Sequence, residues 1–175
     1  MKRFFECLAV ICFTVFTLLI SLAGCSENGQ KAENTVSSSP ASSVSEEALQ
    51  KTAAELAEIV LNSVKFPKTV KVTDKDTIDG MGIDLSLTEE YAVIQQMLSV
   101  DVVEIIIIRA KEENIEQIVD SLEKRKESLI RDFAYYPGQV ESTEATVVGS
   151  KGNIAYLICH KDADKAEEEL LKEIA

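Results

Sequence analysis

The stretch VVEIIIIRA, residues 102–110, decides the fold of this chain. Four isoleucines follow one another at positions 105–108. Successive side chains of a β-strand point to opposite faces of the sheet, so a strand of this composition has no polar face to turn towards water. We predict a central β-strand over residues 102–110 that other elements cover on both faces.

The segments around this strand supply its neighbours. Residues 91–98 have the composition of a second strand, joined to the first by a tight link, and residues 69–73 offer a short strand before them. Residues 145–148 and 154–160 predict a further hairpin around the turn-forming sequence GSKGN.

Apolar residues recur every three or four positions in three other segments, as in amphipathic helices. The first segment starts at a capping box over residues 43–46 and stops at Pro67. The second covers residues 112–133, and the third follows a cap at Asp162. The order α-β-β-α-β-β-α predicts an α+β domain, with a small antiparallel or mixed sheet of about four strands packed against helices. We expect the first helix to cover the second face of the isoleucine strand.

The N-terminal part of the chain is organised differently. Residues 7–23 contain no charged side chain and follow Lys2 and Arg3, which is the layout of a secretory signal. The run ends in LAGC, residues 22–25, which resembles the lipobox of bacterial lipoproteins. This resemblance implies cleavage before Cys25 and a diacylglyceryl group on its thiol. An uncleaved membrane helix and a signal peptide cleaved elsewhere are the alternatives.

The sequence therefore divides into three parts. Residues 1–24 are expected to be a lipoprotein signal peptide, and residues 25–45 the lipidated cysteine and a flexible, serine-rich tether that lacks the apolar residues needed to fold. Residues 46–175 are expected to form a single α+β domain. Acyl chains on one cysteine would hold this domain at the extracytoplasmic face of the cell membrane.

The composition excludes one class of partner. The chain has 18 lysines and arginines against 30 aspartates and glutamates, a formal net charge of −12. Such a chain is repelled by the phosphates of nucleic acids, so we expect no nucleic-acid partner. Of the four cysteines, only Cys159 would remain unmodified in the domain, so an intrachain disulfide is not expected.

Scattered positions in the C-terminal part of the chain carry a resemblance to a known family. They are Met81-Gly82-Ile83-Asp84, Glu104-Ile105, Arg109, Lys111, Arg125, Tyr136-Pro137 and Gly152-Asn153. At these positions the chain resembles the domain of unknown function 4358 family, lipoproteins of clostridia and their relatives. The pattern of that family often has Asp-Glu where this chain has Val103-Glu104. The resemblance implies a Gram-positive lipoprotein and brings no activity with it.

Two groups of residues invite catalytic or metal-binding interpretations. Cys159 and His160 are adjacent, but on a strand they point to opposite faces and cannot form a nucleophilic pair, so we expect Cys159 to be a buried hydrophobe. His160, Asp162 and Asp164 are too few for a zinc site. The aspartates between residues 74 and 84 miss the positions of a calcium loop. We expect no metal, no cofactor and no catalytic residue.

Glu104 is an acid at the head of an apolar strand. If it is buried it needs a cationic partner; otherwise it is a solvent-reaching strand end with a structural salt bridge. The available cations are Arg109, Lys111, Arg125 and Lys126. Tyr136 follows the long helix, and tyrosine is favoured at contact surfaces. The candidate ligand or partner contacts are therefore Glu104, Arg109, Arg125 and Tyr136.

These observations favour a membrane-anchored lipoprotein whose domain binds a protein or a small ligand in the cell envelope. One alternative is an envelope hydrolase, which would need a pocket that combines Glu104 with a second carboxylate. Another is a solute-binding accessory protein, which normally has two lobes around a cleft. The chain has no serine nucleophile elbow and no phosphate-binding glycine loop, so an enzyme is the less favoured interpretation.

Overall fold

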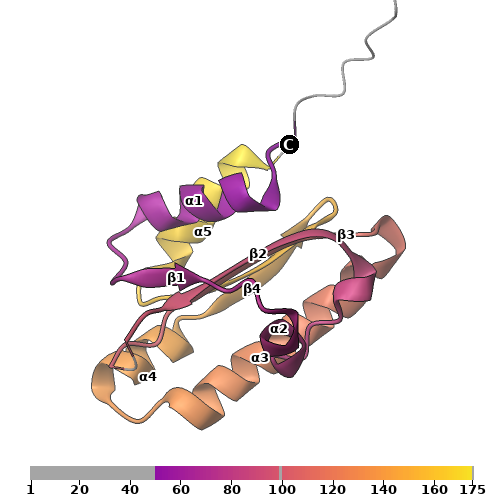
Figure 1. The fold of residues 1–175 in the computed structure, drawn as a ribbon. Helices are drawn as coiled ribbons and strands as arrows, with labels where there is room; N and C mark the ends of the chain where they lie inside the picture. Colours follow the sequence, from indigo (N-terminus) through magenta and orange to yellow (C-terminus); the bar gives the residue numbers. More distant parts are fainter. Residues whose placement is uncertain (1–49, 99, 175) are drawn as a thin grey trace, which may run out of the picture. The chain divides into compact units, whose positions relative to one another are not determined.

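The fold is built on the isoleucine strand. In the computed structural model, which describes residues 50–98 and 100–174, β3 (Glu104–Ala110) is the middle strand of a sheet with the order β1-β2-β3-β5-β4 (Figure 1). The other strands are β1 (Thr69–Lys71), β2 (Thr88–Gln96), β4 (Val147–Lys151) and β5 (Ile154–Cys159). Each strand is antiparallel to its neighbours, so the sheet is antiparallel and not mixed. The predicted α+β class is confirmed, and the short strand β1 raises the strand number to five among the described residues.

Both faces of β3 are covered, as the four isoleucines predict. Ile105 and Ile107 pack in a core with α1 (Ala53–Ser63) and α5 (Ala163–Glu173). Ile106 and Ile108 pack on the other face in a core that contains residues of α2 (Lys75–Gly80) and α3 (Ile115–Phe133). Figure 1 shows these two helical layers on opposite sides of the sheet. The sheet is thus buried on both faces although all its pairings are antiparallel.

The first helix begins later than predicted. The capping box at residues 43–46 lies outside the described residues, but residues 50–52 are not helical and α1 starts at Ala53. Thr52 caps this helix: its side-chain oxygen accepts the Glu55 N–H at 3.2 Å, and the Glu55 carboxylate accepts the Thr52 N–H at 2.8 Å. The Ser/Thr-x-x-Glu pattern of residues 43–46 therefore recurs at residues 52–55, and there it caps α1.

Two short helices were not predicted because neither has an apolar stripe. In α2 the Asp74 carboxylate accepts the Thr77 N–H at 2.9 Å and so caps the first turn. The other short helix, α4 (Pro137–Glu144), begins with proline at its first position, where the missing N–H costs nothing. The predicted long helix is present as α3, with a 3₁₀ turn at Glu112–Asn114 before it.

The last helix has the predicted position, but the side chain of Asp162 does not cap it. Asp162 occupies the position before α5, yet its carboxylate does not cap the helix and pairs with Lys165 at 2.7 Å. The backbone N–H of Asp162 donates instead to Nδ1 of His160 at 3.0 Å. A histidine ring therefore takes part in the turn that leads from β5 into α5.

Candidate functional site

The four candidate contact residues lie at opposite ends of β3. Arg109 is close to its C-terminal end, whereas Glu104 is its first residue. Arg125 contacts Glu104 from α3, and Tyr136 lies between α3 and α4. The structure thus brings Glu104 and Arg125 together and separates them from Arg109.

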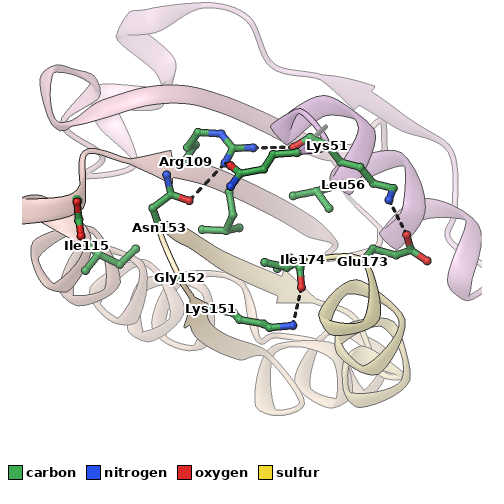
Figure 2. Close-up of a pocket in the computed structure, with 12 residues that line it drawn as sticks. Lys51, Leu56, Arg109, Ile115, Lys151, Gly152, Asn153, Glu173 and Ile174 are labelled. Carbon is green, nitrogen blue, oxygen red and sulfur yellow. Dashed lines mark hydrogen bonds and ion pairs between the residues drawn. The ribbon is translucent and has the colours of Figure 1, made fainter. Parts of the chain in front are cut away.

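Arg109 fastens the start of the described chain to the sheet (Figure 2). Its Nη1 donates to Gln50 Oε1 at 2.8 Å and to Asn153 Oδ1 at 3.3 Å, and its Nη2 donates to the Lys51 carbonyl at 2.6 Å. Its Nε lies 3.6 Å from the Glu90 carboxylate. The guanidinium therefore joins the segment before α1 to β2 and to the β4–β5 turn.

A pocket of about 430 Å³ lies beside this arginine, and we call it the Arg109 pocket. Its lining includes Gln50, Lys51, Leu56, Arg109, Glu112, Ile115, Lys151, Gly152, Asn153, Ile154, Glu173 and Ile174. Lys51 pairs with Glu173 at 2.8 Å, and Lys151 donates to the carbonyls of Leu171 and Ile174 at the end of α5. The cations of this pocket thus already bind groups of the domain itself, which makes the pocket a structural junction.

Glu104 is buried, with 2 % of its surface exposed, and it is paired as a buried acid requires. Arg125 binds it with two parallel hydrogen bonds, Nε to Oε1 at 2.8 Å and Nη2 to Oε2 at 2.7 Å. Gln95 donates a third bond to Oε2 at 2.7 Å. The prediction of a cationic partner is confirmed, and the alternative of a solvent-reaching strand end is wrong because the carboxylate is buried and bonded to Arg125 of α3.

Arg125 links this ion pair to the surface. Burial acts to lower the pKa of Arg125, but the hydrogen bonds and the negative charge of Glu104 raise it above its usual value. The guanidinium also lies 5.9 Å from the ring centre of Phe133 in the last turn of α3. A ligand role for Glu104 or Arg125 stays a prediction, and it would require the pair to open.

Tyr136 is 68 % exposed and Tyr135 is 75 % exposed, and both belong to the segment between α3 and α4. Gln139 holds this segment: its Oε1 accepts the N–H groups of both tyrosines at 3.2 Å. Its Nε2 donates to the Val100 carbonyl at 3.4 Å. The start of α4 is therefore bound to the turn between β2 and β3, and Figure 1 shows the two side by side.

Large apolar side chains are exposed on the β2–β3 turn, on the last turn of α3 and on the segment before α4. We call them the hairpin surface, and its members are Met97, Leu98, Val100, Ile130, Phe133, Tyr135 and Tyr136. Among residues 50–98 and 100–174 there are eight large exposed hydrophobic side chains, and seven of them belong to this set. Exposed large apolar side chains on adjoining segments of the chain are typical of an interaction site.

A second pocket opens beside the hairpin surface, and we call it the His160 pocket. Its volume is about 420 Å³, and it lies between the residues after α1, the β2–β3 turn, the start of α4 and the end of β5. His160 is 4 % exposed and its ring centre lies 4.5 Å from that of Phe66. Burial is the main cause that lowers the pKa of His160, which favours the neutral ring.

Cys159 behaves as predicted. It is fully buried in the same core as Ala155 and Leu157, and its Sγ lies 3.7 Å from the Val102 carbonyl and 3.6 Å from that of Ser142. Burial raises the pKa of its thiol to about 11, so the thiolate required of a nucleophile is scarce at neutral pH.

The acidic segment around α2 serves local structure. Asp84, like Asp74, caps a short turn, and its carboxylate accepts the Ser86 N–H at 2.9 Å. Within the part of the chain that the structure describes, no three His, Cys, Asp or Glu side chains are placed to hold a metal ion. None of the described helices is long and apolar enough to cross a membrane. The predicted signal peptide and Cys25 lie outside the described residues.

Sequence reasoning missed most of the hairpin surface. It assigned Leu98 to a strand and treated Ile130 and Phe133 as members of the buried stripe of a helix. The available signal was the pair Tyr135-Tyr136 before a proline. Only the packing shows that the apolar residues around this pair are left uncovered.

Comparison with known proteins places these features in a family. The curated proteins and the solved structures compared with the chain give no match. The family model described as "Domain of unknown function (DUF4358)" matches residues 62–160, which include all five strands of the described sheet and all four candidate contact residues. The chain therefore belongs to the domain of unknown function 4358 family.

Proposed function

We propose that this protein is a membrane-anchored lipoprotein on the extracytoplasmic face of the cell membrane, and that its domain binds another protein through the hairpin surface. The observation that carries the binding role is the exposure of this surface. The lipid anchor rests on the lipobox at residues 22–25.

The composition of the hairpin surface suits a protein partner. Tyrosine, phenylalanine and methionine are enriched in protein–protein interfaces, and this surface contains all three. Gln139 also accepts hydrogen bonds from the backbone N–H groups of Tyr135 and Tyr136. The positions of both tyrosines are therefore partly ordered before binding. The acidic chain disfavours an anionic lipid surface as the occupant.

The position of the surface agrees with a tethered role. Gln50, where the described chain starts, is held at the Arg109 end of β3, whereas the hairpin surface lies at the Glu104 end. A tether from Cys25 would reach the domain at the end remote from this surface. Fully extended, the segment between Cys25 and Gln50 spans at most about 90 Å.

The alternatives have less support. A carboxylate-based hydrolase needs Glu104 in a pocket with a second acid, but Glu104 is bound by Arg125 and Gln95 and lines neither the Arg109 pocket nor the His160 pocket. The described residues do not form a two-lobed receptor, since residues 50–98 and 100–174 belong to one compact unit.

Site-specific photocrosslinking in living cells tests the proposal. A photoreactive residue at Leu98 or at Tyr135 should join the chain to the same partner protein, because both side chains are exposed on the hairpin surface. The matched control is Glu113, which is exposed near the other end of β3. Equal crosslinking from Glu113, or no protein product from Leu98 and Tyr135, would contradict the proposal.

A double variant tests the role of the hairpin surface independently. Leu98→Ser combined with Tyr136→Ser should strongly reduce crosslinking from Tyr135, because it removes apolar area from the proposed interface. Both residues are more than half exposed, so the free energy of unfolding should change by no more than about 0.5 kcal/mol for each substitution. Unchanged crosslinking in a folded double variant would place the partner elsewhere.

A further inference from the structure

The walls of the His160 pocket come from two pairs of segments. On one side, the ring contact between Phe66 and His160 holds the residues after α1 against the end of β5. On the other side, the bond from Gln139 to Val100 holds α4 against the β2–β3 turn. The lining thus has two parts, which we call the two walls of the groove, and Val100 and Tyr136 of the hairpin surface belong to the second.

The charged residues of the groove are segregated between these walls. Lys65 and Lys161 belong to the wall of Phe66 and His160, whereas Asp101 and Glu141 belong to the wall of Val100 and α4. The ion pairs within the described residues include none of these four side chains. The groove therefore has a basic wall and an acidic wall, in contrast to the Arg109 pocket, whose cations are already bonded.

The lining of the groove also contains apolar residues. Val102 and Val103 belong to it and are almost fully buried, and Phe66 and Pro67 contribute further apolar surface. The volume of about 420 Å³ accommodates a large side chain together with adjoining backbone. Hot spots of protein interfaces typically combine such an apolar pocket with a polar rim.

We propose that the His160 pocket receives one large apolar side chain of the partner protein, on a segment that has an acidic residue on the side of Lys65 and Lys161 and a basic residue on the side of Asp101 and Glu141. This inference rests on the proposed function, because it assigns the chemistry of the partner at the edge of the hairpin surface. The apolar side chain supplies buried area, and the two opposite charges select the segment.

The absence of tryptophan from the sequence makes the test direct, since any tryptophan emission comes from the probe. The probes are the blocked tripeptides Glu-Trp-Lys and Lys-Trp-Glu, with Gln-Trp-Gln as the neutral control. The full chain, as purified from cells, is titrated into each peptide, with its buffer and any lipid carrier as the blank. A charged peptide should show emission at shorter wavelength and bind about three- to tenfold more tightly than Gln-Trp-Gln, a preference that decreases as salt is added.

Charge-removing variants assign the effect to the pocket. Lys65→Gln with Lys161→Gln should remove the preference for the charged peptide, and so should Asp101→Asn with Glu141→Gln. The matched control, Lys124→Gln on an exposed position of α3, should leave it unchanged. Equal binding of charged and neutral peptides, a preference that survives both double variants, or no spectral change up to about 10 mM peptide would overturn the inference.

The two proposals fail differently. If crosslinking from Leu98 and Tyr135 identifies a partner but the peptides do not discriminate by charge, the pocket chemistry is wrong and the proposed function stands. If the charged peptides bind and crosslinking finds no protein partner, the proposed function is wrong and the ligand preference of the pocket stands.

Discussion

Gly149 in β4 shows how closely two strands of this sheet approach each other. It pairs with Tyr156 in β5, and the tyrosine ring lies over the glycine and donates from its hydroxyl group to Glu167 of α5 at 2.7 Å. A Cβ atom on Gly149 would lie 2.7 Å from Cζ of this ring. The position therefore needs glycine for lack of space, and the sequence alone had indicated only a turn there.

Gly149→Ala should destabilise the domain by about 1–3 kcal/mol, because the ring must move and its bond to Glu167 is strained or lost. Urea unfolding measures this change. Gly138→Ala is the control: nothing lies near its added Cβ, and alanine in α4 should be neutral or slightly stabilising. If Gly149→Ala is as stable as the parent chain, the tyrosine ring does not lie over this glycine.

The buried ion pair between Glu104 and Arg125 is a second contact on which the stability of the domain depends. The side chain of Glu104 is 2 % exposed and that of Arg125 is 12 % exposed, and the pair joins β3 to α3. A buried pair of this kind contributes little net stability, but one partner without the other is costly. The same reasoning explains why an acid is tolerated at the head of an apolar strand.

Arg125→Met should therefore cost about 3–5 kcal/mol in free energy of unfolding, since it leaves the Glu104 carboxylate buried with Gln95 as its remaining partner. Adding Glu104→Leu should recover most of that loss, and a double-mutant cycle from urea unfolding gives the coupling. Additive losses in the double variant would show that the two side chains do not depend on each other.

At the scale of elements, His160 connects three segments. Its ring contacts Phe66 after α1, its Nδ1 accepts the Asp162 N–H before α5, and it directly follows β5. Asp162 and Glu141 act to raise the pKa of His160 and Lys161 acts to lower it, but burial dominates and the pKa is lowered. The folded domain thus binds a proton at this ring less readily than the unfolded chain does.

The free energy of unfolding should therefore decrease as the pH falls below about 6.5, the usual pKa of histidine in an unfolded chain, with a slope of at most about 1.4 kcal/mol per pH unit. Above this pH the contribution is constant. Urea unfolding between pH 7.5 and 5 measures the slope, and His160→Gln should flatten it. The carboxylates whose pKa is lowered, such as Asp74 and Asp84, titrate at more acidic pH. An unchanged slope in His160→Gln would assign the pH dependence to another group.

At the scale of the whole molecule, the domain has two ends with different tasks. The Arg109 end binds the segment that precedes α1, through hydrogen bonds to Gln50 and Lys51. The other end carries the hairpin surface and the groove with a basic and an acidic wall. In the proposed function, the first end receives the tether and the second receives the partner.

The proposed lipid anchor on Cys25 can be tested with a single substitution. Cys25→Ser should leave the precursor unprocessed or release the protein from the membrane, because the thiol is the proposed site of lipidation. Fractionation of cells and the intact mass of the product measure both outcomes. Cys7→Ser, within the apolar run, is the control and should be processed normally. Normal cleavage and membrane retention of Cys25→Ser would disprove the lipobox assignment.

The sequence by itself determined the core of this fold. Four consecutive isoleucines require burial on both faces of β3, and the helical spacing of apolar residues locates α1, α3 and α5, because these signals depend on neighbouring residues alone. The need of a buried Glu104 for a cationic partner follows from electrostatics, and it too could be stated in advance. The small helices α2 and α4 could not, since they depend on caps and a proline and not on an apolar stripe.

Only the tertiary structure decided which apolar residues remain uncovered and which charges find partners. Leu98 and Phe133 resemble core residues in the sequence, but in the folded domain 60 % and 40 % of their surfaces remain exposed. Arg125, and not Arg109, pairs with Glu104, because Arg125 reaches the N-terminal end of β3 from α3 whereas Arg109 lies near the other end of the strand. Exposure and pairing depend on contacts between residues far apart in the chain, and local sequence patterns carry no information about these contacts until the elements are packed.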